Sequence, residues 1–235
     1  MTSSSGALNM HLVVFDIDGT LTNTNLEDGE CYWRAICELL GFSSEQPQWS
    51  EFRHVTDVGI ASELCERHLH RQLTSVDVEA LSFRLATLLK VALVDKNPRA
   101  YQIPGSGEIL SILGKSFDFA VALATGGLRV SAELKLRSAN LLNPFIPIAS
   151  SNDAVSREEI IRIAARRAAE KHATQFAKLT YVGDGVWDAK AARDLGCRFI
   201  GIGSGEQADR LRQAGAGKVI PDYRPAEGFL DLLAD

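Results

Sequence analysis

Short runs of apolar residues recur along the chain, and segments with helical spacing separate them. Most of these runs are continuously apolar instead of alternating, which is typical of parallel strands that are covered on both faces. Strands that alternate with helices in this way predict an α/β fold with a doubly wound parallel sheet. The expected strands span residues 11–16, 117–125, 145–150, 178–184, 197–203 and 218–220.

Two of the intervening segments carry signals for where a helix begins or ends. Ser156 is followed three residues later by Glu159, which is a capping-box pattern and predicts a helix start. Gly196 follows "VWDAKAARDL" and predicts a helix stop, because glycine readily adopts the left-handed backbone conformation of helix ends.

One connection breaks the alternation, since no strand pattern appears between Thr22 and about Pro98. A connection of that length without structure is improbable in a compact domain, so the segment is expected to form a unit of its own. The sequence therefore predicts an all-helical cap at residues 23–97, inserted into an α/β core formed by 1–22 and 98–235. Two apolar groups with helical spacing support it: Trp33, Ile36, Cys37 and Leu40, and Leu81, Leu85, Leu88, Leu89 and Ala92.

Composition narrows the possible classes of function. The formal net charge is -5 and the pI is near 5.6, so no basic face for nucleic acid is expected. No apolar run is long enough to span a bilayer, and the first ten residues lack the pattern of a signal peptide. The four cysteines show no metal-type CxxC spacing and are expected to be reduced thiols. Together these features predict a cytoplasmic protein that binds neither nucleic acid nor membrane.

The first apolar run ends in "DIDGT", which places Asp16 and Asp18 two positions apart. Residues two apart project to the same side of an extended chain, and open α/β sheets bind ligands at the carboxyl ends of their strands. Carboxylates this close repel each other, so a proton or a hard cation such as Mg²⁺ is expected to neutralise them. The plainer alternative is a turn that happens to contain two aspartates. An EF-hand is excluded, because Leu21 occupies the position that requires glycine.

Three further features lie where a predicted strand ends or a helix begins. "GDGVWD" places Asp184 at a strand end and Asp188 at a helix start. "LATGG" contains Thr125 and Gly126, whose hydroxyl and backbone N–H groups could hold an anion before a helix. Arg157 opens a helix, where a cation opposes the helix dipole, so it is either a site residue or a solvated side chain.

In this order, "DIDGT", "LATGG", a basic residue and "GDGVWD" resemble the motifs of the haloacid dehalogenase-like hydrolase superfamily. "IPGSGEILSIL" (103–113) and the helical insertion are similar to its phosphoglycolate phosphatase-like branch, which carries a helical cap. The resemblance implies a Rossmann-like core and an enzyme that hydrolyses a small phosphorylated metabolite. The sequence departs from the family pattern at the basic residue, which is usually lysine in the family and is Arg157 here.

The resemblance also implies a mechanism that depends on Mg²⁺ and passes through an aspartyl-phosphate. Asp16 would be the nucleophile, and Asp18 would be the general acid and base. The residues expected around the metal are Asp16, Asp18 through its backbone carbonyl, Asp184, and Asp188 either as a ligand or as a residue that orients one. The residues expected around the phosphate are Thr125, Gly126 and Arg157.

Two other functions stay open. A phosphomutase of the beta-phosphoglucomutase type would use the same core under a cap that excludes water. A non-catalytic nucleotide-binding domain is indicated only by "GIGSG", whose glycines miss the GxGxxG spacing. In the insertion, Arg53 and His54 are either contacts for an anionic substrate tail or, as is more usual for such residues, solvated side chains.

Overall fold

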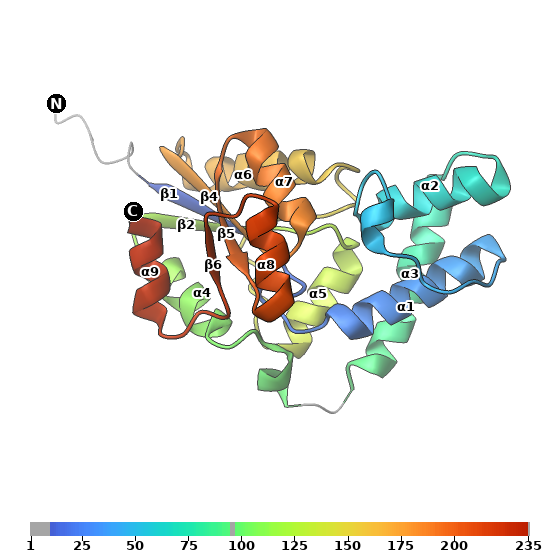
Figure 1. The fold of residues 1–235 in the computed structure, drawn as a ribbon, viewed down its shortest axis with the longest axis horizontal. Coiled ribbons are helices and arrows are strands. Elements are labelled where there is room, and N and C mark those ends of the chain that lie inside the picture. Colours follow the sequence, from blue (N-terminus) through green and yellow to red (C-terminus); the bar gives the residue numbers. More distant parts are fainter. Residues whose placement is uncertain (1–9, 95–96, 235) are drawn as a thin grey trace.

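The centre of the molecule is a six-stranded sheet in which every neighbouring pair is parallel (Figure 1). The computed structural model describes residues 10–94 and 97–234. The expectation that the first ten residues are not a signal peptide therefore falls almost entirely outside the described residues. All six predicted strands are confirmed. In the order β3-β2-β1-β4-β5-β6 across the sheet, they are β1 (His11–Phe15), β2 (Phe119–Ala124), β3 (Ile148–Ala149), β4 (Lys178–Gly183), β5 (Arg198–Ile202) and β6 (Lys218–Ile220).

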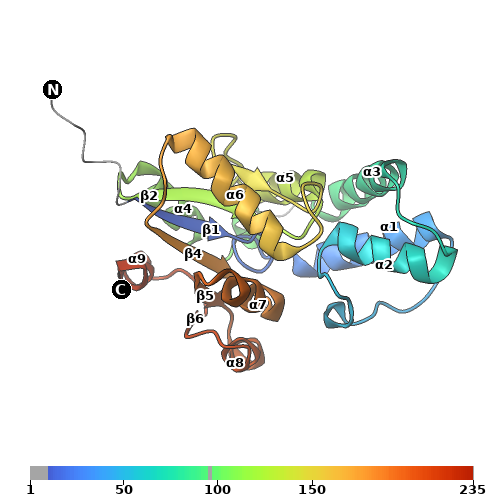
Figure 2. The ribbon, with the colours of Figure 1, turned by 90° about the horizontal axis from the view of Figure 1, so that it is seen from above.

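Helices cover both faces of the sheet, which explains why residues 12–15 of β1 are continuously apolar (Figure 2). Val13 and Phe15 belong to the apolar cluster on one side of the sheet, whereas Leu12 and Val14 belong to the cluster on the other side. All five residues of β1 are buried, so the expected doubly wound fold is confirmed. The helices of the core are η2 (Pro98–Tyr101), α4 (Ser106–Lys115), α5 (Arg129–Ser138), α6 (Arg157–His172), α7 (Val186–Leu195), α8 (Gly205–Gln213) and α9 (Ala226–Ala234).

Both predicted helix boundaries are confirmed. The Ser156 hydroxyl accepts a hydrogen bond from the Glu159 backbone N–H at 3.3 Å, directly before α6. Gly196 ends α7 with a left-handed φ of 65°, a conformation that costs glycine nothing.

The segment between β1 and β2 folds into a helical unit at the carboxyl end of the sheet (Figures 1 and 2). Trp33, Ile36, Leu81 and Leu85 are among its buried residues, so the two predicted helix faces do form its interior. The helical insertion is confirmed, and its division at residues 23 and 97 stays a prediction. We call this unit the lid, and its helices are α1 (Asn25–Leu40), η1 (Trp49–Glu51), α2 (Asp57–Leu69) and α3 (Ser75–Ala92).

The lid contacts the core through hydrogen bonds of backbone and side-chain groups at the start of α2. The Asp57 N–H donates to the Gly126 carbonyl at 2.8 Å, and the Thr56 hydroxyl donates to the Val155 carbonyl at 2.8 Å. In return, the Leu128 N–H donates to the Asp57 carboxylate at 2.7 Å. The lid is therefore held directly against the loop that carries the predicted anion site.

Among the residues described, no helix is both long and apolar enough to cross a membrane. Of the four cysteines, all free, Cys65 is buried and the other three are half-buried. The structure therefore agrees with the prediction that the four cysteines are thiols and not disulfides.

Candidate active site

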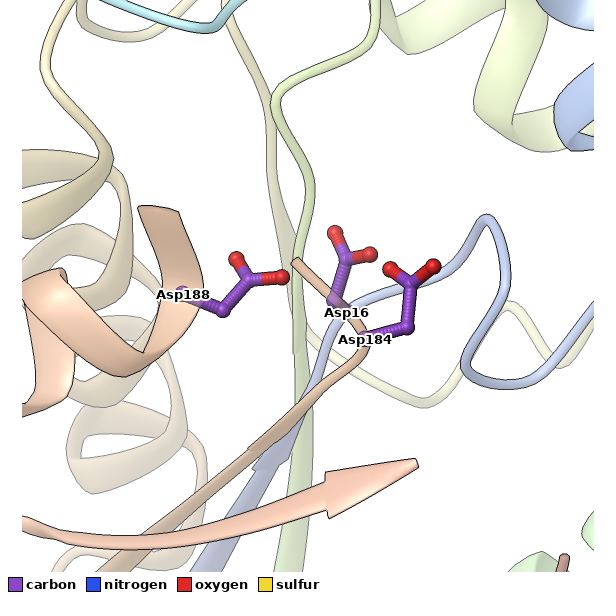
Figure 3. Close-up of side chains that lie close together, drawn as sticks. All are labelled: Asp16, Asp184 and Asp188. Carbon is purple, nitrogen blue, oxygen red and sulfur yellow. The ribbon is translucent and has the colours of Figure 1, made fainter. Parts of the chain in front are cut away.

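The carboxyl ends of β1 and β4 bring three of the predicted aspartates together (Figure 3). Asp16 directly follows β1, Asp184 directly follows β4, and Asp188 lies in the first turn of α7. One carboxylate oxygen of each lies within 4.8 Å of those of the other two. The chain leaves β1 and β4 toward opposite edges of the sheet, and such a switch point is where open α/β sheets bind ligands.

The environment of these carboxylates favours a bound cation. Burial, reinforced by the charge of Asp188, raises the pKa of Asp16 well above its usual value. Burial and then Asp188 also raise the pKa of Asp184, to about 7. Acidic oxygens that repel each other in a buried place are the donor set that Mg²⁺ prefers, so these residues fit that ion.

Asp188 differs from the other two because the protein already occupies both of its oxygens. Its Oδ1 accepts from the Tyr181 hydroxyl at 2.9 Å and lies 3.3 Å from Nη1 of Arg157. Its Oδ2 accepts from the Gly185 N–H at 2.9 Å. Of the two roles expected for Asp188, these contacts favour orienting its neighbours.

Arg157 reaches the same point from the first residue of α6. Its Nη1 lies 3.0 Å from Oδ1 of Asp16, and its Nη2 donates to the Val55 carbonyl of the lid at 3.0 Å. Its side chain is only 10% exposed, so it is not a solvated helix-start residue. This arginine places a permanent positive charge beside the predicted nucleophile.

The first glycine of "LATGG" makes this approach possible. A Cβ atom on Gly126 would lie 2.4 Å from Nη2 of Arg157, a separation that real side chains do not show. Thr125 is buried beside it, and its hydroxyl accepts from the Gly127 N–H at 3.0 Å. The three residues predicted around the phosphate therefore lie next to one another and line the same cavity as Asp16.

Asp18 lines the same cavity and is bound by a lysine that the sequence reasoning missed. Its Oδ1 accepts from the Thr24 hydroxyl at 2.7 Å, and its Oδ2 accepts from Nζ of Lys135 at 2.5 Å. Nζ of Lys135 also lies 2.8 Å from Oδ1 of Asp28 in α1. Lys135 has no exposed surface, so its charge depends on these two carboxylates.

A signal for Lys135 was present in the sequence of α5. The buried residues of this segment repeat with helical spacing, and Lys135 falls on that stripe between Ala132 and Leu136. A lysine on an otherwise apolar helix face is expected to have a buried acidic partner. The sequence could have indicated the burial of Lys135, but not the identity of its partners.

Asp57 of the lid completes this network. Burial raises the pKa of Asp57 to about 8, so its carboxyl group largely keeps its proton near neutral pH. Burial also raises the pKa of Asp28, to about 6, although Lys135 opposes that shift. Neither lid carboxyl therefore carries an uncompensated charge at pH 7.

A cavity of about 400 Å³ lies between the lid and the core and includes these groups. The lid side is lined by residues of α1, η1 and α2, and the core side by Asp16 and its neighbours. Arg53 and His54, the expected contacts for an anionic tail, are not among the lining residues, so the structure does not bring them to the site. Prominent on the lid side are Tyr32, Gln48, Trp49, Ser50 and Ile60.

A family model described as haloacid dehalogenase-like hydrolase matches residues 10–196. Among solved structures, a hydrolase from Pseudomonas syringae is 22% identical with a TM-score of 0.69, covering 95% of this chain and 99% of its own. A Haemophilus somnus protein described as a predicted phosphoglycolate phosphatase is 14% identical with a TM-score of 0.60, covering 97% of this chain and 100% of its own.

CbbY from Rhodobacter sphaeroides, solved in complex with phosphate, is 16% identical with a TM-score of 0.60, covering 92% of this chain and 96% of its own. At these identities the similarity shows a shared fold only, and the substrates of those proteins are not assigned to this chain. No curated protein matches the sequence significantly.

Proposed function

The chain belongs to the haloacid dehalogenase-like hydrolases, and from this membership we propose that it is a Mg²⁺-dependent phosphatase of a small organic phosphate monoester. The observation that carries the proposal is the position of the Asp16 carboxylate. It lies in the cavity at the end of β1, 3.0 Å from the Arg157 guanidinium and grouped with Asp184 and Asp188. A carboxylate nucleophile beside a fixed cation is suited to attack an anionic phosphoryl group.

In the first step, an Asp16 oxygen attacks phosphorus and the bond to the leaving oxygen breaks, which forms an aspartyl-phosphate. In the second step, water attacks the same phosphorus and releases inorganic phosphate, which restores Asp16. Asp18 gives a proton to the leaving oxygen and later takes one from the water. In this structure the two oxygens of Asp18 accept hydrogen bonds from Lys135 and Thr24 at the edge of the same cavity.

The remaining phosphoryl oxygens would be bound by the Thr125 hydroxyl, the Gly126 N–H and Arg157. A Mg²⁺ ion held by Asp16, Asp184 and the backbone carbonyl of Asp18 would neutralise the charge that gathers among these carboxylates and the phosphate. The buried, mutually repelling carboxylates described above support this assignment.

The test is a screen of phosphorylated metabolites with Mg²⁺, in which released phosphate is measured for the wild type and for Asp16→Asn. We expect hydrolysis of at least one monoester by the wild type and none by the variant, together with a labelled phosphoryl group that can be trapped on Asp16. Turnover that requires a sugar bisphosphate would favour the phosphomutase instead. Unchanged activity in Asp16→Asn would rule out the proposed nucleophile.

A further inference from the structure

The lid side of the cavity presents aromatic, amide and hydroxyl groups to the part of the substrate that leaves. Tyr32 and Trp49 pack edge to face with ring centroids 5.9 Å apart, and Gln48 and Ser50 flank Trp49 on the same wall. No lysine, arginine or histidine from the described residues of the lid lines the cavity. An anionic group bound under the lid would therefore find no cationic partner on that wall.

The charged groups of the lid wall also supply no surplus positive charge. The ammonium group of Lys135 lies between Asp18 and Asp28 and is paired with both carboxylates, so it is not free to bind an anionic ligand. Asp57 is 8% exposed and accepts the Leu128 N–H. A second anion on the substrate would thus lose its hydration under the lid without gaining an ion pair, which is costly for a charged group.

The two arginines of the cavity do not change this balance on the lid side. Arg157 is engaged by Asp16, Asp188 and the Val55 carbonyl and lies at the predicted phosphate position. Arg210 belongs to α8 of the core and is exposed. It lies one turn beyond Gln207, whose amide donates to Asp184. Neither guanidinium group comes from the wall formed by α1, η1 and α2.

We propose that this phosphatase selects esters whose leaving alcohol is uncharged and carries hydroxyl groups, and that its lid rejects alcohols with a second anion. The inference rests on the phosphatase function proposed above and adds the class of substrate. Gln48 and Ser50 can exchange hydrogen bonds with hydroxyl groups, while Trp49 and Tyr32 offer apolar faces to the carbon-bound hydrogens of a polyol. A cationic alcohol gains no unpaired carboxylate on this wall, because Asp18 and Asp28 both contact Lys135.

Phosphate esters that differ only in the charge of the leaving group test this selection. The two-carbon set is 2-hydroxyethyl phosphate, phosphoglycolate and phosphoethanolamine, and the three-carbon pair is glycerol 3-phosphate and 3-phosphoglycerate. With Mg²⁺ present, we expect the uncharged member of each set to have the highest kcat/KM, by at least about a hundred-fold over its carboxylate analogue.

Three outcomes would overturn the inference. Equal or faster hydrolysis of the carboxylate esters would show that the wall does not reject anions. A preference for phosphoethanolamine would show that the leaving group is cationic. Failure of all five esters, together with failure of the wider metabolite screen, would instead remove the proposed phosphatase function itself.

A pair of matched variants locates the selection in the lid wall. Gln48→Lys adds a cation inside the cavity, and Gln72→Lys adds the same charge to an exposed lid position outside it. We expect Gln48→Lys to raise kcat/KM for phosphoglycolate relative to 2-hydroxyethyl phosphate by at least about ten-fold, since one compensated charge is worth more than about 1.4 kcal/mol. Gln72→Lys should leave that ratio unchanged. The same ratio in all three proteins would place the selection elsewhere and contradict the inference.

Discussion

Replacing Lys135 with methionine is expected to destabilise the protein by about 3 kcal/mol at pH 8. Lys135 is fully buried, and its Nζ lies 2.5 Å from Asp18 and 2.8 Å from Asp28. Removing one partner of a buried ion pair typically costs about 3–5 kcal/mol, because the remaining charge stays buried without compensation. The Asp18 and Asp28 side chains keep 20% and 16% of their surface exposed, so water screens part of their charge. We therefore take the lower end of that range.

The change is measurable by thermal unfolding. For a chain of 235 residues, each kcal/mol corresponds to a shift in Tm of about 2–4 °C, so Lys135→Met should lower Tm by about 6–12 °C. Methionine keeps the length and most of the volume of the lysine stem, which limits the loss from packing. The expected loss is therefore electrostatic in origin.

The electrostatic origin predicts a direction with pH. The pKa of Asp28 is already raised to about 6 by burial, and without Lys135 it should rise further. The folded variant then binds more protons than the unfolded chain between about pH 5 and 8, so its free energy of unfolding falls as pH rises. The gap in Tm between variant and wild type should accordingly be small at pH 5 and largest at pH 8.

Lys190→Met is the matched control. Lys190 also has two acidic neighbours, Asp194 at 2.5 Å and Glu158 at 3.8 Å, but 60% of its side chain is exposed. Exposed pairs contribute little, so this variant should lose less than about 1 kcal/mol at any pH in the range. Equal losses in the two variants, or a loss in Lys135→Met that does not change with pH, would refute the reasoning.

The remaining predictions concern the metal and the reaction. EDTA should abolish phosphate release. Mg²⁺ should raise Tm more at pH 8 than at pH 6, because protons compete with the metal for Asp184, whose pKa is about 7. A Tm that does not change on addition of Mg²⁺ at either pH would contradict the proposed metal site. Asp18→Asn should slow turnover by about a hundred- to ten-thousand-fold. Leaving groups of low pKa should partly restore that variant but not Asp16→Asn, and equal rescue of both would contradict the division into nucleophile and general acid. Arg157→Ala should lower kcat/KM by at least about a hundred-fold, and Arg157→Lys should recover part of it; wild-type kinetics in Arg157→Ala would place the basic role elsewhere.

Most of the candidate site could be predicted because it depends on strand ends. Asp16, Thr125 and Asp184 each follow a strand of a parallel sheet, and the carboxyl ends of such strands meet at one edge. Arg157 and Asp188 begin helices that start at the same edge, so they join the group without any specific long-range contact being known. Local patterns were sufficient for these residues.

The direction of Asp18 could not be predicted in the same way. It depends on Lys135, which lies 117 positions further along the chain, and on how α1 of the lid packs against α5. The lid wall presents the same difficulty, because helical spacing identifies the apolar face of α1 but not the lid residues that face the core. Arg53 and His54, which the sequence offers either as contacts for an anionic tail or as solvated residues, do not line the cavity, and Tyr32 and Trp49 were not foreseen there.

The hydrogen bond from the Leu128 N–H to Asp57 gives the molecule a natural reporter of lid motion. Leu128 is fully buried at the start of α5, where a backbone N–H has no partner within its own helix. Its partner comes from the lid, so exchange of this amide proton with solvent deuterium requires the lid to lift. The exchange rate of one amide therefore reads the population of open molecules, without any label or substrate.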